Sequence, residues 1–216
     1  EKNSLFTAEP FKSNKDKFSF YIVNTNTDFK CKVGCQGVSS LICCDNQAVM
    51  DAASQCTHDQ IFLLLSESTL CGSASTYAKI CAKNSLAPMV IMHELGHSFG
   101  ELADEYSYDD VFGGYDIGEI NSPNCDIEGC NKWKDISSGC YKGCSYDSLF
   151  RSEDKDSIMY GYVPMFNAVS QKEILSKINN YTWQHEKRER STPPKRSYLV
   201  NANYKKGSIT LGSVVI

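Results

Sequence analysis

Residues 93–97 read His93-Glu94-Leu95-Gly96-His97, and this short stretch decides how the rest of the chain is interpreted. Residues four apart on an α-helix differ by about 40° around its axis and by about 6 Å along it, so both imidazoles can reach one tetrahedral zinc ion. The Glu94 carboxylate follows the first histidine, where it can take a proton from a zinc-bound water and pass it to a leaving amine. The pattern therefore predicts the core of a zinc site that performs hydrolysis.

The residues around this stretch predict a buried helix from Pro88 to Phe99. They are apolar nearly all round, and proline is favoured at the first helical position. Two histidines and a glutamate are costly in such a place unless something satisfies them, and zinc would do so. This agreement favours a zinc site over a helix with two incidental histidines and a surface glutamate.

A catalytic zinc needs a third protein ligand, which must come from downstream. Gly100 can end the helix and fold the chain back toward the metal. Asp104 and Glu105 are then the nearest acids, and the spacing alone does not choose between them.

The run from His93 to Tyr106 resembles the IgA-peptidase family of bacterial zinc metallopeptidases, which are metzincin-like zincins. The likeness extends in outline from residue 9 to about residue 181. It implies a zinc endopeptidase fold with Asp104 as the third ligand, and leaves Glu105 to accept a histidine N–H or to face solvent. The chain departs from related patterns at Ala103, where a metzincin places a ligand, and at Glu101, where a small residue is expected.

A second motif reads Asp156-Ser157-Ile158-Met159-Tyr160-Gly161-Tyr162. It resembles the Met-turn beneath the zinc of metzincins, which makes Met159 the apolar floor of the site. Tyr160 and Tyr162 are candidates to bind the oxyanion of the reaction. The alternative for either tyrosine is simple packing within a loop.

The fold class that we predict is α/β, a metzincin-like zincin. Strands at 17–24 and 60–65 flank a helix that Asp45 can cap, and they begin an N-terminal twisted mixed sheet. After the active-site helix comes a loop-rich, disulfide-bonded half that holds the Met-turn. It ends in a long helix, predicted to start with a capping box of Ser170 and Glu173.

The chain divides into three parts on this interpretation. Residues 1–183 are the zinc metallopeptidase catalytic domain, and the charged stretch 184–196, which ends in two prolines, is a linker. Residues 197–216 are a short β segment or the start of a further domain, because so few residues cannot form a core alone.

Eleven cysteines indicate an oxidising compartment, so we expect a secreted or extracytoplasmic protein. Ten can pair, which leaves one free thiol. Four of them, Cys125, Cys130, Cys140 and Cys144, could instead hold a structural zinc, but their spacing is looser than usual, which favours disulfides.

The charge and hydropathy patterns exclude two classes of partner. The net charge is −4 and the body of the chain lacks an extended Lys/Arg face, which makes nucleic acid a poor partner. The longest apolar stretches are far too short for a membrane span. The acidic stretch 101–119 could bind calcium or line a cleft, but it fits a solvated loop better.

The sequence therefore predicts a secreted zinc-dependent endopeptidase with protein or peptide substrates. A competing interpretation is a cysteine-rich, protease-like binding module with little or no activity. The presence of Glu94 argues against that alternative, because loss of this one carboxylate would be the simplest route to inactivity. The pattern does not define the substrate or the oligomeric state.

Overall fold

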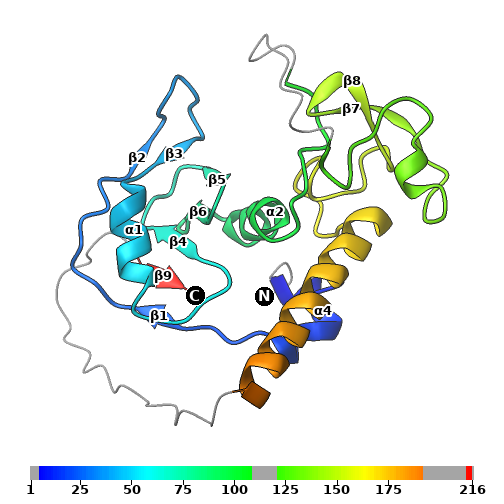
Figure 1. The fold of residues 1–216 in the computed structure, drawn as a ribbon. Helices are drawn as coiled ribbons and strands as arrows, with labels where there is room; N and C mark the ends of the chain where they lie inside the picture. Colours follow the sequence, from blue (N-terminus) through cyan, green and yellow to red (C-terminus); the bar gives the residue numbers. More distant parts are fainter. Residues whose placement is uncertain (1–4, 109–120, 192–212, 216) are drawn as a thin grey trace.

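The computed structural model describes residues 5–108, 121–191 and 213–215. Helix α2 (Ala87–Ser98) lies between two parts of the molecule (Figure 1). A mixed sheet with α1 (Asn46–Ala53) forms one part, and a hairpin with the long helix α4 (Ala168–Ser191) forms the other. The predicted α/β class is correct at this level.

The main sheet has five strands in the order β1-β9-β4-β6-β5. Strands β4 and β6 are parallel, whereas β5 pairs antiparallel with β6, and β9 pairs antiparallel with both β4 and β1. The sheet is therefore mixed, as predicted, and β5 lies at its edge. The bounds are β1 Ile22–Val23, β4 Phe62–Leu65, β5 Gly72–Ala74, β6 Ala78–Cys81 and β9 Ser213–Val215.

The first predicted strand, residues 17–24, is wrong over most of its length. Only β1 (Ile22–Val23) forms there, and the short helices η1 (Leu5–Thr7) and η2 (Lys12–Lys17) precede it. The aromatic residues that suggested a strand pack on earlier residues instead, because Phe18 meets both Phe6 and Phe11 edge to face and Phe20 meets Phe6. The predicted strand–helix–strand order is present in part. Strands β1 and β4 run parallel, but β9 lies between them in the sheet.

Helices α1 and α2 cover opposite faces of the sheet, because alternate residues of β4 point to opposite sides. Leu63 packs with the α1 residues Val49 and Ala53, whereas Phe62 packs with α2. Asp45 caps α1 as predicted, its carboxylate accepting from the Ala48 N–H at 3.2 Å. The helix ends at Ala53, and Cys56 just beyond it still packs against the same core as Val49 and Ala53.

The sequence analysis did not predict two antiparallel hairpins. Strands β2 (Lys32–Val33) and β3 (Ile42–Cys43) form one, and β7 (Tyr141–Cys144) and β8 (Tyr146–Arg151) form the other. A short helix, η4 (Asn131–Trp133), precedes the second hairpin.

Disulfides account for ten of the eleven cysteines, and Cys56 is free, as the arithmetic predicted. The four cysteines between residues 125 and 144 are disulfide-bonded, which confirms the prediction of disulfides over a structural zinc site. The pairs are Cys31–Cys44, Cys35–Cys43, Cys71–Cys81, Cys125–Cys144 and Cys130–Cys140.

Helix α4 begins earlier than predicted, at Ala168. Asn167 takes the capping role that we assigned to Ser170, because its Oδ1 accepts from the Ser170 N–H at 2.9 Å. The Ser170 hydroxyl is buried without a hydrogen-bond partner. The helix also continues to Ser191, through the first part of the stretch predicted to be a linker.

Some predictions fall partly or wholly on residues outside the described ranges. These are the acidic stretch from residue 109 onward, the remainder of the linker at 192–196, and the terminal segment apart from β9. In the part of the chain that the structure describes, we find no helix long and apolar enough to cross a membrane.

Candidate metal centre

Helix α2 presents His93 and His97 on one face, one turn apart. Their Nε2 atoms lie 3.1 Å from each other. Each Nδ1 faces a backbone carbonyl, that of Ile158 at 2.8 Å for His93 and that of Leu102 at 2.7 Å for His97. Both rings therefore donate through Nδ1–H and direct Nε2 toward a common point, where each Nε2 offers a lone pair to a cation once it is deprotonated.

The chain turns back after α2 and brings Asp104 to the same point. Its Oδ1 lies 3.0 Å from His93 Nε2 and 3.4 Å from His97 Nε2. The predicted breaker, Gly100, is needed for close packing, because a Cβ there would lie 2.7 Å from the Gly96 carbonyl oxygen. The left-handed residue of the turn is Glu101, with φ +54°, and its carboxylate pairs with Lys177 at 2.7 Å.

The three donors suit a small cation. Two imidazole lone pairs and a carboxylate oxygen repel one another unless a proton or a metal lies between them, and Asp104 Oδ1 is buried without a hydrogen-bond partner. A tetrahedral zinc with ligands at 2.0–2.2 Å would space its donors by roughly 3.3–3.5 Å. The observed separations of 3.0, 3.1 and 3.4 Å are close to that spacing. These residues therefore fit zinc.

The electrostatics of the three donors also favour a cation at this point. Burial disfavours a charged His97, but the Asp104 carboxylate outweighs burial and raises the pKa of His97 to about 9. Burial also opposes ionisation of Asp104, yet the two imidazoles hold its pKa below the usual range. A metal would compete with protons for this site, which makes its binding pH-dependent.

Glu94 stands beside the three donors but is not one of them. It is only 6% exposed, and its carboxylate packs against the backbone of β5, where a Cβ at Gly72 would overlap Glu94 Oε1. Burial raises the pKa of Glu94, and the neighbouring imidazoles oppose that rise. A buried carboxyl with a raised pKa, next to three converging donors, is suited to exchanging protons.

Met159 lies directly beneath α2, in the turn that the sequence singled out. It is fully buried, and a Cβ at Gly96 would lie 2.5 Å from Met159 Sδ. The same turn supplies the Ile158 carbonyl that orients His93, and the Met159 carbonyl accepts from the Glu105 N–H at 2.8 Å. The turn thus holds one histidine and the backbone that follows Asp104.

Glu105 neither accepts a histidine N–H nor faces solvent, which corrects the expectation for it. Backbone carbonyls orient both imidazoles, and Glu105 is fully buried. Its Oε1 accepts from the side-chain amides of Asn124 at 3.1 Å and Asn167 at 2.7 Å. Glu105 therefore joins the Asp104 segment to the cap of α4. The sequence alone does not predict this role, because its partners lie far away along the chain.

The two candidate tyrosines have different surroundings. The ring of Tyr160 lies 4.8 Å from the Arg151 guanidinium carbon. Tyr162 is half-exposed, and burial together with the charges of Glu94 and Asp104 raises the pKa of its phenol. Of the pair, Tyr162 is the one whose phenol lies within electrostatic reach of the acids of the centre.

Tyr106 is a further residue of the centre, and sequence reasoning gave it no role. Burial raises the pKa of its phenol strongly, and the Asp104 carboxylate adds to this by charge and by accepting a hydrogen bond. The signal available beforehand was its place two residues after Asp104 at the end of the motif.

Comparison with known families gives one match. The family described as IgA Peptidase M64 matches residues 31–138, which is half of the chain. The chain belongs to this family. The suspected resemblance is thereby confirmed, and M64 membership identifies the protein as a peptidase.

The M64 match covers α2, the Asp104 segment and Tyr106, and it ends before the turn at Met159 and before α4. Comparison with curated proteins found no significant match.

Proposed function

We propose that this M64 peptidase is a secreted, zinc-dependent endopeptidase in which His93, His97 and Asp104 hold the metal. The observation that carries the proposal is the convergence of three donor atoms, two on half-buried histidines and one on the buried Asp104, whose charges and lone pairs call for a cation. When bound, zinc would polarise the scissile carbonyl and lower the pKa of a water molecule to about 7.

Glu94 is the proton carrier in this proposal. As a carboxylate it takes the proton of the attacking water, and as a carboxylic acid it gives that proton to the nitrogen of the leaving amine. Its burial against β5 supports both steps, because a raised pKa brings the two protonation states closer in free energy. Packing on Gly72 keeps the carboxylate beside the donors.

The phenol of Tyr162 donates a hydrogen bond to the oxyanion, while that of Tyr106 donates to Asp104 and keeps this ligand in place. Both have pKa values raised above that of free tyrosine, so both keep their protons at neutral pH. Hydrogen bonds aimed at developing charge are among the larger contributions to catalysis. Tyr160, which packs on Arg151, has a structural role here.

Strand β5 supports a polypeptide substrate. It is the edge strand of the main sheet, and its residue Gly72 contacts Glu94. An extended peptide can pair with a free strand edge through its backbone, which would place a bond in the middle of a chain beside the carboxylate. Five disulfides support secretion, because such bonds persist in oxidising compartments.

The test uses an internally quenched peptide library blocked at both ends, with zinc content measured on the same sample. We expect cleavage that a chelator abolishes and zinc restores. Glu94→Gln should bind zinc and fold normally but lose about 10²–10⁴-fold in kcat, while Glu101→Gln, on the exposed turn, serves as the matched control.

The alternative remains a binding module that uses the same framework without turnover. Zinc binding by wild type without cleavage of any library peptide would favour it. Activity of Glu94→Gln within a few-fold of wild type would remove Glu94 from the mechanism.

A further inference from the structure

Asp104 lies on a segment, residues 102–106, that belongs to no helix or strand of the main sheet. A carboxylate can meet two imidazoles at 3.0 and 3.4 Å only if the backbone that carries it is held in place. Helix α2 fixes the histidines through its own hydrogen bonds, whereas the segment that carries Asp104 is not helical. The contacts that hold its backbone must therefore come from elsewhere in the chain.

Asn124 holds the residue immediately before Asp104. Its Oδ1 accepts from the Ala103 N–H at 2.8 Å, and its Nδ2 donates to the Ala103 carbonyl at 2.9 Å. One side chain thus pairs with both polar groups of a backbone residue, as a neighbouring strand would. Asn124 is fully buried, so water does not compete for these bonds.

Ser145 holds the other side. Its N–H donates to the carbonyls of Asp104 at 2.8 Å and of Tyr106 at 2.9 Å, and its hydroxyl adds a bond to Asp104 at 3.3 Å. Ser145 adopts φ +59°, a left-handed conformation that lets one N–H reach two carbonyls of the same segment. Hydrogen bonds from Asn124 and Ser145 therefore hold the backbone on both sides of Asp104.

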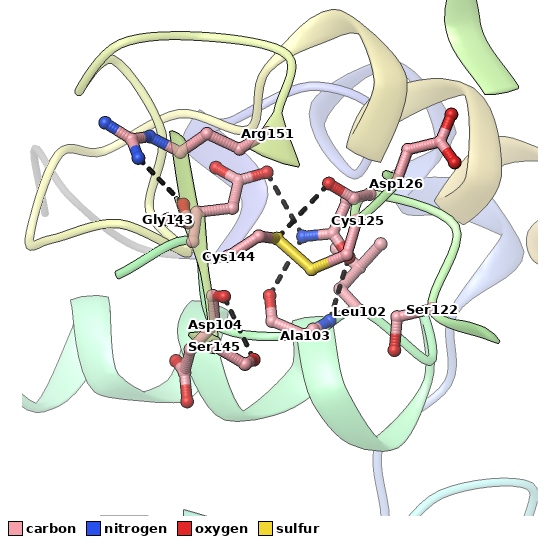
Figure 2. Close-up of a disulfide and its surroundings, with 12 residues drawn as sticks. Leu102, Ala103, Asp104, Ser122, Cys125, Asp126, Gly143, Cys144, Ser145 and Arg151 are labelled. Carbon is pink, nitrogen blue, oxygen red and sulfur yellow. Dashed lines mark hydrogen bonds between the residues drawn. A yellow bond between two sulfur atoms is a disulfide. The ribbon is translucent and has the colours of Figure 1, made fainter. Parts of the chain in front are cut away.

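A disulfide links the two residues that hold this segment, Asn124 and Ser145. Asn124 precedes Cys125 and Ser145 follows Cys144, and these two cysteines are bonded to each other. Figure 2 shows the disulfide against the segment that carries Asp104, with Ser145 beside it. Both cysteines are fully buried. The bond therefore adds a covalent link between Asn124 and Ser145, beside the backbone bridge that Asp126 and Phe150 form between the same two segments.

We propose that Asn124 and the Cys125–Cys144 disulfide position Asp104, so that the metal affinity of this chain depends on this disulfide in particular. The inference rests on the proposed zinc site and deepens it. The Cys130–Cys140 disulfide lies in the same half, but within the described residues neither of its cysteines has a hydrogen bond to residues 102–106. Its loss should leave Asp104 where it is.

The experiment measures zinc dissociation constants by competition with a chromophoric chelator, on the full chain. Cys125→Ala/Cys144→Ala is compared with Cys130→Ala/Cys140→Ala, which opens a loop of the same order, with sequence separations of 19 and 10. We expect the first double variant to bind zinc about 10–100-fold more weakly, as loss of a group that orients a ligand does. The second should stay within about threefold of wild type.

Asn124→Leu provides an independent test that leaves all five disulfides intact. It removes both bonds to Ala103 and should also weaken zinc binding by about 10–100-fold. Asn131→Leu is its matched control, because Asn131 is an exposed residue on η4 in the same half of the molecule. The cobalt-loaded proteins give a second readout, since a displaced carboxylate changes the visible spectrum of the metal.

Thermal unfolding of each metal-free variant separates positioning from folding. The proposal is overturned if Cys125→Ala/Cys144→Ala or Asn124→Leu binds zinc as tightly as wild type, or if the control disulfide variant loses as much affinity. It is also overturned if both test variants fail to fold without metal, because the contacts would then be structural. If wild type itself binds no zinc, the proposed function fails rather than the positioning of Asp104.

Discussion

Gly96→Ala tests whether the turn at Met159, which packs beneath α2, positions the ligands of the metal site. In an ordinary helix this change would stabilise the protein by about 1 kcal/mol. Here the new methyl group would lie 2.5 Å from Met159 Sδ and 3.2 Å from Phe166 Cε1. Non-bonded atoms prefer about 3.5–4.0 Å, so Met159 must move by about 1 Å within a fully buried place.

Two effects of this shift can be estimated. Overpacking costs about 1–3 kcal/mol, which exceeds the helical gain and leaves a net loss of about 0–2 kcal/mol in the free energy of unfolding. The neighbouring Ile158 carbonyl accepts from His93 at 2.8 Å, and the part of the shift that reaches the backbone of the turn weakens that bond. We therefore expect zinc affinity to fall about 10–100-fold.

The assay combines urea unfolding of the metal-free protein with a zinc competition titration. Gly161→Ala is the control, because Gly161 belongs to the same turn and a Cβ there meets nothing within 4 Å. That control should bind zinc like wild type. If Gly96→Ala binds zinc as tightly as wild type and is more stable, the turn does not govern the site and this reasoning is wrong.

Three more outcomes are expected. Asp104→Ala should lose zinc while the metal-free protein stays folded, whereas Glu105→Ala should lower the free energy of unfolding by about 1–3 kcal/mol, because two buried amides lose their acceptor. Equal zinc loss in both would reopen the choice of ligand. Tyr106→Phe should reduce kcat more than Tyr160→Phe, with the opposite order contradicting the assignment. Thiol titration of the unfolded, unreduced chain should find one thiol, which peptide mapping should place at Cys56, and more than four would contradict the disulfide framework.

Features set by local sequence were predictable. The spacing of His93 and His97 places both rings on one face because the helical period is a local property. Asp45 caps α1 for the same reason, since the capped N–H lies three residues away. The family likeness selected Asp104, and the structure brings that residue to the histidines.

Features set by distant partners were not predictable. Ser170 and Glu173 have the spacing of a capping box, yet Asn167 caps the helix, and Asn167 also donates to the buried Glu105 from 62 residues away. The same limit applies to Phe18 and Phe20, which looked like part of a strand but pack on Phe6 and Phe11.

The sequence by itself determined the donor types, their order on α2 and the parity of the cysteines, because these follow from composition and from a period of 3.6 residues. Only the tertiary structure decided which cysteines pair, which carbonyls orient the imidazoles, and how Asn124 and Ser145 hold the segment that carries Asp104. Each of these contacts joins residues that the chain separates by turns of irregular backbone. Their geometry depends on packing energies summed over the whole core, and no short window of sequence contains those energies.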